Sequence, residues 1–176
     1  LSNRFVLITG CSGGGKSSLL AELNARGYAT IEEPGRRIIR QEIQTGGRAL
    51  PWIDLAAFAR QAINMALEDL SQAQALPGWV FFDRGLIDAA SALESETGQA
   101  FQNDLAMQHC YHNQVFLAPP WPEIYQTDPE RKHGFEASLA EYDRLEQLLP
   151  ELGYRVITLP KISVHADRKS TRLNSS

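Results

Sequence analysis

Residues 10–18 read Gly10-Cys11-Ser12-Gly13-Gly14-Gly15-Lys16-Ser17-Ser18, which matches the P-loop pattern G-x-x-x-x-G-K-[ST]. The apolar run 5–9 comes directly before this segment and is typical of a buried parallel strand. Apolar residues at positions 19, 20 and 23 follow it at helical spacing. A glycine loop between a strand and a helix directs backbone N–H groups and the positive end of the helix dipole toward one anion. The segment therefore predicts a site for the phosphates of a nucleotide.

The residues of this loop have distinct predicted roles. We expect Lys16 to reach the β- and γ-phosphates of ATP and to act in catalysis, and the Ser17 hydroxyl to bind Mg²⁺. The predicted nucleotide-binding residues are Ser12, Gly13, Gly14, Gly15, Lys16, Ser17 and Ser18. The alternative is a glycine loop that joins a strand and a helix by chance and binds no ligand.

The length and composition of the chain restrict the class of protein to which it can belong. The chain has 176 residues, a net charge of −4 and two cysteines. The length predicts one domain, and no apolar run approaches the roughly 18–20 residues of a membrane span. Two cysteines cannot build a disulfide framework and favour a reducing, cytoplasmic location. The negative charge argues against nucleic acid as a partner. We expect a monomer or a homodimer.

The two ends of the chain carry unusual sequence. The chain begins with Leu1 rather than Met, so we expect native residues to precede it. Residues 167–176 have almost no apolar content and resemble the in-frame translation of a common short-read sequencing adapter. We interpret this segment as an artefact, the alternative being a native polar tail. The expected domain therefore covers residues 1–166.

Strand and helix patterns alternate along this domain, which predicts an α/β fold with a doubly wound, five-stranded parallel sheet. The predicted strands are 4–9, 28–31, 79–83, 114–117 and 154–159. The predicted helices are 16–26, 36–45, 51–74, 86–94, 99–109 and 135–149. Ligands of such sheets bind beyond the carboxyl ends of the strands, so the residues there are the candidates for function.

Asp83 and Arg84 follow the third predicted strand. An aspartate after four apolar residues resembles a Walker B arrangement, in which the carboxylate holds Mg²⁺ directly or through water. Arg84 is then expected to face a phosphate or an anionic group of the substrate. The alternative for Asp83 is a cap of the helix that begins near Leu86.

Glu33 follows the second predicted strand, and Arg36 and Arg37 come just after it. A carboxylate at this strand end is placed to take a proton from a substrate hydroxyl. Pro34 restrains the backbone after Glu33, and the Arg37 guanidinium is suited to a phosphate or carboxylate of the substrate. A solvated charged turn is the alternative.

A loop of about sixteen residues, 119–134, is expected after the fourth strand. Its length, prolines and aromatic residues suggest a lid, and Arg131 is expected to bring a cation over the transferred phosphoryl group. The alternative is an ordinary surface connection.

The loop 10–18, the Glu33-Pro34 pair with Arg37, the Asp83-Arg84-Gly85 segment and the expected lid together resemble the P-loop kinases of nucleosides and nucleotides. Within this group the chain is most similar to a predicted ATPase/kinase family that includes the nicotinamide riboside kinase domain of NAD-biosynthesis regulators. The similarity covers residues 5–162. It implies the strand order 2-3-1-4-5, an acceptor bound between Glu33 and Arg84, and a short helix after the fifth strand, where the adapter-like sequence stands.

The expected function is an ATP-dependent, Mg²⁺-requiring phosphotransferase that acts on a nucleoside- or nucleotide-like small molecule. The alternative is a regulatory ATPase or nucleotide-dependent switch without a small-molecule acceptor. A GTPase is disfavoured because the sequence has no Asn-Lys-x-Asp element. A ring-forming motor is disfavoured because about 166 residues leave no room for a helical lid domain.

Overall fold

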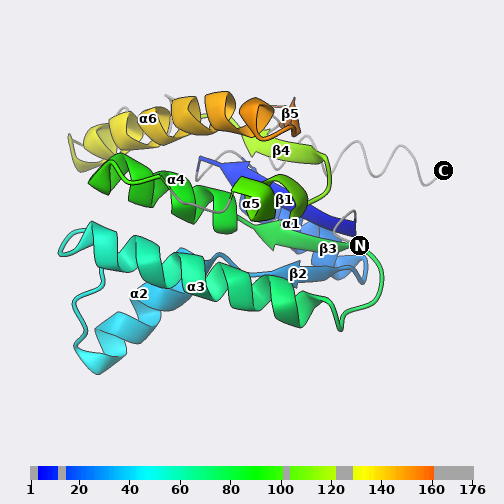
Figure 1. Cartoon of the computed structure of the whole chain (residues 1–176), viewed down its shortest axis with the longest axis horizontal. Coiled ribbons are helices and arrows are strands. Elements are labelled where there is room, and N and C mark those ends of the chain that lie inside the picture. The colour runs from blue at the N-terminus through cyan, green and yellow to red at the C-terminus, as the bar shows by residue number, and fades with distance from the viewer. Residues whose placement is uncertain (1–3, 12–14, 101–103, 122–128, 161–176) are drawn as a thin grey trace.

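The structure is a computed structural model that describes residues 4–11, 15–100, 104–121 and 129–160. Its strands are β1 (Phe5–Gly10), β2 (Ala29–Ile31), β3 (Val80–Asp83), β4 (Gln114–Ala118) and β5 (Arg155–Thr158). Its helices are α1 (Lys16–Ala25), α2 (Pro34–Thr45), α3 (Leu55–Ala73), α4 (Leu86–Thr97), α5 (Asp104–His109) and α6 (Pro129–Glu151). The strands form one parallel sheet in the order β2-β3-β1-β4-β5 (Figure 1). This confirms the predicted fold class and strand order.

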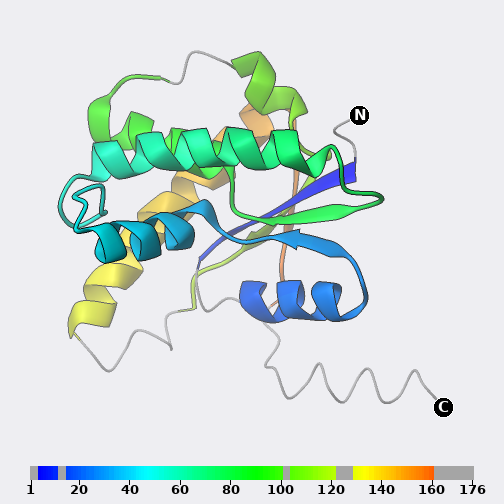
Figure 2. The same ribbon diagram turned by 90° about the horizontal axis from the view of Figure 1, so that it is seen from below.

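Helices cover both faces of the sheet. In the view of Figure 1, α3, α4 and α6 lie in front of the sheet and α1 lies behind it, and Figure 2 separates α1 from these helices in the same way. The division follows from right-handed crossovers. The chain moves along the sheet in one direction from β1 to β2, and in the opposite direction from β2 through β3 and β4 to β5. The fold is therefore a three-layer, doubly wound sheet.

β1 occupies the centre of the sheet and is buried along its whole length. It pairs with β3 on one edge and with β4 on the other, and helices pack on both of its faces. A strand buried on all sides tolerates a continuous apolar sequence, which explains the run 5–9. Its last residue, Gly10, places the loop that follows at the middle of the carboxyl edge of the sheet.

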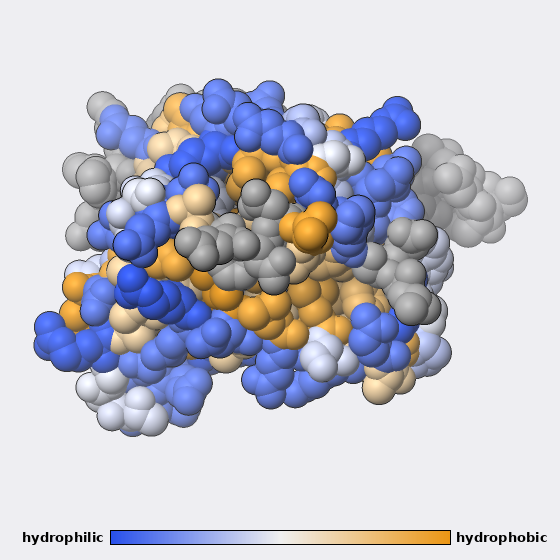
Figure 3. Space-filling model, viewed as in Figure 1, coloured by the Kyte–Doolittle hydropathy of each residue, from blue (hydrophilic) through white to orange (hydrophobic). Residues whose placement is uncertain are grey.

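The core lies between the sheet and the helices. α3 packs most extensively against α4, and Figure 3 shows hydrophobic residues along this seam with hydrophilic residues around the rim. Apolar side chains that are fully buried include Phe5, Leu7, Ile8, Ile38, Phe82, Leu86, Ile87, Leu117, Leu145 and Leu149. No described helix has both the length and the apolar character needed to cross a membrane.

Most element boundaries agree with the prediction or differ from it by one to three residues, but the starts of α3, α5 and α6 differ more, and α3 begins at Leu55, four residues later than predicted. α5 begins at Asp104, five residues later than predicted. α6 begins at Pro129, six residues before the predicted start. Proline suits the first turn of a helix, and the sequence after it contains good helix formers. The expected length of this loop, about sixteen residues, is therefore wrong: the connection after β4 is shorter, and Arg131 belongs to the first turn of α6. The predicted role of this segment as a lid stays a prediction.

Candidate nucleotide and acceptor site

The loop after β1 starts in close contact with β4. Gly10 has φ +103°, and a Cβ atom added to it would lie 2.3 Å from the carbonyl oxygen of Ala118. The Cys11 N–H donates to the same carbonyl at 2.9 Å. Only glycine satisfies both requirements at position 10. Cys11 is buried, and burial raises the pKa of its thiol to about 11, so this residue fills space in the core as a neutral thiol.

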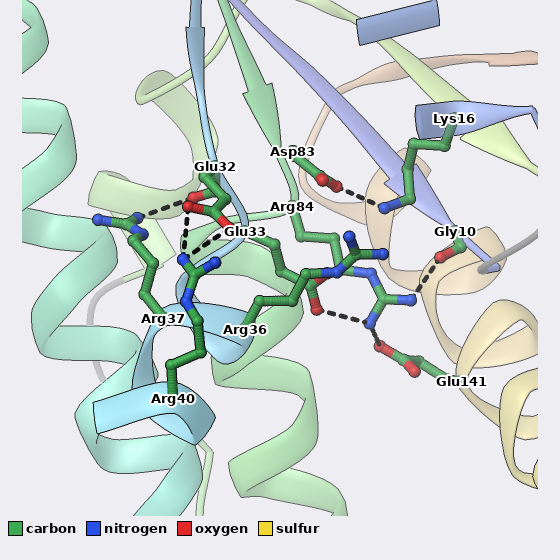
Figure 4. A network of polar contacts seen from close by, with 10 residues as sticks. All are labelled: Gly10, Lys16, Glu32, Glu33, Arg36, Arg37, Arg40, Asp83, Arg84 and Glu141. Atoms are coloured by element: carbon green, nitrogen blue, oxygen red, sulfur yellow. Dashed lines mark hydrogen bonds and ion pairs between the residues drawn. The ribbon is translucent and has the colours of Figure 1, made fainter. Parts of the chain in front are cut away.

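Lys16 and Asp83 form a buried ion pair. Lys16 opens α1, Asp83 closes β3, and the Lys16 Nζ donates to the Asp83 Oδ1 (Figure 4). The Lys16 side chain is only 2% exposed and that of Asp83 10%. The two residues that were predicted separately, one for phosphate and one for metal, therefore contact each other directly.

Ser17 and Asp83 line one cavity of about 280 Å³ between α1 and the ends of β2 and β3. A hydroxyl and a carboxylate on one cavity are suitable oxygen ligands for Mg²⁺, which normally completes its shell with water and substrate phosphates. Among the described residues, no three His, Cys, Asp or Glu side chains converge on a metal site. A cation shared with a bound nucleotide does not require such a cluster, so Ser17 and Asp83 fit the predicted metal role.

Arg84 turns away from Asp83 toward a different set of partners (Figure 4). Its Nη2 donates to the carbonyl oxygen of Gly10 at 2.8 Å. Its Nη1 lies 3.5 Å from the Glu33 Oε1 and 3.6 Å from the Glu141 Oε1. Burial disfavours the charged guanidinium, but the carboxylates around it, Glu141 foremost, keep the pKa of Arg84 above its ordinary value. The Arg84 guanidinium thus links β1, the residue before α2, and α6.

The backbone of Arg84 is strained. Its φ of 56° is the one positive φ of a non-glycine residue among those described, a conformation that costs about 1–2 kcal/mol. Two hydrogen bonds hold the following residues: the Gly85 N–H donates to the Asp88 Oδ2 and the Leu86 N–H donates to the Tyr111 hydroxyl, both at 2.9 Å. These contacts keep the turn that aims Arg84 at the site.

Asp88 ties this turn to the central strand. Its second oxygen, Oδ1, accepts a hydrogen bond from the Thr9 hydroxyl of β1. The side chain is buried, and burial raises the pKa of Asp88 to about 6, although Arg84 and the Thr9 hydroxyl act in the opposite direction. Asp88 therefore fixes the position of Arg84 relative to the strand that carries the glycine loop.

A small cavity of about 70 Å³ lies beside Arg84. Its charged lining residues are Glu33, Arg84, Asp88 and Glu141. The rest of its lining is glycine or apolar and comes from α2, α3 and α4, with Phe58 as its largest member. The Glu33 carboxylate also contacts the Arg36 Nε at 3.3 Å. Glu33 and Arg84, predicted to flank an acceptor, thus line one cavity.

The Arg37 side chain has other partners. Its guanidinium contacts both carboxylate oxygens of Asp69 on α3 and donates to the carbonyl oxygen of Glu32 at 2.8 Å. The Glu32 carboxylate in turn pairs with Arg40 at 2.7 Å on the surface. Arg37 does not line the cavity beside Arg84, and its predicted role in binding substrate stays a prediction.

The structure therefore brings together Lys16, Ser17, Asp83, Glu33 and Arg84 at the carboxyl ends of β1, β2 and β3. Residues 12–14 lie outside the described residues, as does the side chain of Arg131, so their predicted roles stay predictions. Sequence reasoning missed Asp88 and Glu141. Asp88 had a signal, because an acidic residue three positions after a helix-capping position often accepts the cap N–H. Glu141 had none, since it reaches Arg84 from more than fifty residues away.

Solved structures with this fold include kinases of small molecules. Shikimate kinase from Acinetobacter baumannii in complex with shikimate is 14% identical, with a TM-score of 0.55, over 97% of this chain and 90% of that chain. Deoxyadenosine kinase from M. mycoides with bound dATP is 15% identical, with a TM-score of 0.56, over 97% and 100% of the two chains. Thymidylate kinase from Ehrlichia chaffeensis is 16% identical, with a TM-score of 0.52, over the whole of both chains. At these identities the likeness concerns the fold.

No curated protein matches the sequence at a significant level. A protein-family model described as an AAA domain, by contrast, matches residues 5–168. The match extends from the first residue of β1 to beyond β5 and so includes the glycine loop, Asp83 and every helix described. The kinase-like fold of the solved structures agrees with this match and with the resemblance to P-loop kinases. The chain therefore belongs to this family of AAA domains, with a fold like that of P-loop nucleotide kinases.

Proposed function

We propose that this protein transfers the γ-phosphoryl group of ATP to a hydroxyl group of a small nucleoside- or nucleotide-like acceptor. The observation that carries the proposal is the pairing of Glu33 with Arg84 on one cavity, directly beside the Lys16–Asp83 pair. A carboxylate and an arginine that face each other on a cavity with a partly apolar lining are suited to bind a small acceptor and to take the proton of its hydroxyl group.

Glu33 is the proposed general base. In the reaction the acceptor hydroxyl oxygen forms a bond to the γ-phosphorus, and the bond from that phosphorus to the β–γ bridging oxygen breaks. ADP leaves with the bridging oxygen, and the hydroxyl proton passes to the Glu33 carboxylate. Because Glu33 comes directly before Pro34, the first residue of α2, its backbone position is fixed by the start of a helix.

The two cationic residues act on different groups. Lys16 is placed to contact the β- and γ-phosphates. Arg84 lines the acceptor cavity and holds the Glu33 carboxylate toward it. Ser17 and Asp83 are the residues that hold Mg²⁺ in this proposal, and the ion neutralises charge on the β- and γ-phosphates when it is bound. Binding of nucleotide requires Lys16 to exchange its contact with Asp83 for contacts with phosphate oxygens.

The experiment is a screen of the purified protein with ATP and Mg²⁺ against nucleosides, nucleotides and nicotinamide riboside, with acceptor-dependent ADP release as the readout. Glu33→Gln keeps the shape of the side chain but removes the base. General-base catalysis contributes about 10²–10⁴-fold, so we expect a loss of turnover in this range. The affinity for ATP, measured by calorimetry, is expected to stay within about twofold.

Glu68→Gln is the matched control, because it removes the same charge from an exposed position of α3, where the carboxylate accepts a hydrogen bond from Gln72. It is expected to keep turnover within about twofold. If no acceptor stimulates ADP release, and Glu33→Gln leaves the basal hydrolysis of ATP unchanged, the protein is a regulatory ATPase or switch and the proposal is wrong.

A further inference from the structure

If the proposed function is right, the charge of the cavity beside Arg84 determines which class of acceptor this cavity binds. Three carboxylates and one guanidinium line it: Glu33, Asp88 and Glu141 against Arg84. Glu33 directly precedes α2 and Glu141 lies in α6, so the excess of negative charge is a property of the cavity and not of one segment. Together, the charged lining residues that the structure describes carry two negative charges more than positive ones when all are ionised.

The Arg84 charge is already neutralised before any ligand binds. Its Nη1 faces two carboxylates at 3.5 and 3.6 Å, and its Nη2 is bonded to the Gly10 carbonyl. An anionic group on the acceptor would have to compete with Glu33 and Glu141 for the same nitrogen, in a buried setting where like charges repel strongly.

The other cations near the cavity, within the part of the chain that the structure describes, have partners of their own. Arg37 is bound to Asp69, and Arg40 is bound to Glu32. Arg36 is half exposed and pairs with Glu33 from outside the cavity. None of these three side chains lines the cavity. A phosphate or carboxylate on the acceptor therefore meets an excess of negative charge among the described lining residues.

One polar atom of Arg84, a residue that lines the cavity, lacks a partner. The Nε of Arg84 is buried and has no hydrogen-bond partner among the described residues. A buried donor of this kind is costly unless a ligand satisfies it. A neutral oxygen or nitrogen of a ligand accepts such a bond without adding negative charge, and the apolar lining around Phe58 suits the uncharged part of the same molecule.

We propose that the acceptor is a hydroxyl compound without a negative charge, such as a nucleoside, and that Glu141 is a specificity-determining residue that excludes anionic acceptors. This inference rests on the proposed function and narrows it. The three kinases of similar fold are named for acceptors of different charge, a carboxylate, a nucleoside and a nucleotide, so the fold alone does not decide the question.

The test compares kcat/KM for uncharged nucleosides, for their 5′-monophosphates and for shikimate, with ATP and Mg²⁺ held constant. We expect turnover with at least one nucleoside, and a kcat/KM at least 100-fold lower for every anionic compound. Glu141→Gln removes one negative charge from the surroundings of Arg84 and keeps the shape of the side chain at position 141. In this variant we expect the ratio of kcat/KM for nucleosides to kcat/KM for anionic compounds to fall at least tenfold. Glu146→Gln is the matched control, because it removes the same charge from an exposed position of α6 and is expected to leave the ratio unchanged.

The outcomes separate the two proposals. Turnover that is confined to monophosphates or shikimate overturns the inference and leaves the phosphotransferase function intact. Equal effects of Glu141→Gln and Glu146→Gln overturn the role of Glu141. An absence of turnover with every compound, in a protein that binds ATP, overturns the proposed function and the inference with it. A thermal unfolding curve for each variant shows that it is folded under the assay conditions.

Discussion

Asp83 and Arg84 are consecutive residues at the end of β3, yet they serve two regions with opposite electrostatics (Figure 4). Asp83 forms one contact with one cation, Lys16, in a buried and balanced pair. Arg84 is surrounded by several carboxylates that outnumber it. The turn at Arg84, with its positive φ, directs this side chain to other partners than those of Asp83 and so divides one edge of the sheet into two distinct regions.

This difference in charge indicates what a ligand has to displace when it binds in each region. In the proposed function, the phosphates of the nucleotide displace the Lys16–Asp83 ion pair and bring the negative charge that replaces Asp83 as the partner of Lys16. On the acceptor side, Arg84 is already held by Gly10, Glu33 and Glu141, so a ligand enters a cavity whose charges are arranged beforehand. The strained backbone of Arg84 fits this view, because strain of this kind persists where the surroundings enforce it.

The largest effect is expected from breaking the nucleotide side at Lys16. Lys16→Ala removes the cation that faces the phosphates and leaves the buried Asp83 carboxylate without its partner. We expect the affinity for ATP and Mg²⁺ to fall at least 100-fold by calorimetry. Arg26→Ala removes a cation from the residue after α1, where it pairs with Glu22 on the surface, and should leave the affinity unchanged. Wild-type affinity in Lys16→Ala would show that the loop 10–18 does not bind the nucleotide.

Asp83→Asn separates the metal role from a helix-capping role. An amide is a poor ligand for Mg²⁺ but keeps the size and a hydrogen-bonding oxygen of the carboxylate. We expect turnover to fall by about 10²-fold, while the affinity for ATP measured with EDTA present falls far less. The structure already argues against a cap, since the Gly85 N–H and Leu86 N–H are bonded to Asp88 and Tyr111 instead. Unchanged turnover in Asp83→Asn would remove the metal role.

The sequence predicts the nucleotide side better than the acceptor side, for a physical reason. Lys16 and Ser17 belong to a contiguous motif, and Asp83 follows a short buried strand, so local pattern and topology suffice to place them. Glu33 and Arg84 follow from the rule that ligands bind at the carboxyl ends of strands. Glu141 depends on the packing of α6 over the sheet, which no local pattern contains. The start of α6 also differs from the prediction, because a run with many prolines is typical of a loop, whereas Pro129 begins a helix.

Asp88 allows a test of the turn that joins the two regions. Its pKa of about 6 in the folded protein lies above the ordinary 3.8, so the folded state holds the proton more tightly than the unfolded state. The stabilisation from this group is present below about pH 4 and is lost as the pH rises through 6. The displacement from 3.8 to about 6 corresponds to about 3 kcal/mol, at roughly 1.36 kcal/mol per pKa unit.

The measurement is urea unfolding of the wild type and of Asp88→Asn at pH 4 and pH 7. Asparagine does not titrate, so the difference between the two proteins isolates Asp88 from every other carboxyl group. We expect the unfolding free energy of Asp88→Asn, relative to the wild type, to rise by about 2 kcal/mol from pH 4 to pH 7, because part of the effect is already present at pH 4, where the unfolded carboxyl group is partly ionised. Thr9→Val removes one donor to Asp88 and keeps its charge, and is expected to raise its pKa further. A constant difference between wild type and Asp88→Asn at the two pH values would contradict the burial of this carboxyl group.

The smallest effect on the reaction is expected from Arg37, which lies outside both regions. Its side chain is 27% exposed and that of Asp69 is 9% exposed, so the pair is partly buried and joins α2 to α3. Arg37→Ala leaves the Asp69 carboxylate without its cation and should lower the unfolding free energy by about 1–3 kcal/mol. Asp69→Asn should have a similar effect, and the double variant should lose less than the sum of the two. If Arg37 acts only through this pair, kcat/KM for the acceptor stays within about threefold in both single variants. A loss of kcat/KM in Arg37→Ala that Asp69→Asn does not share would instead place Arg37 on the substrate.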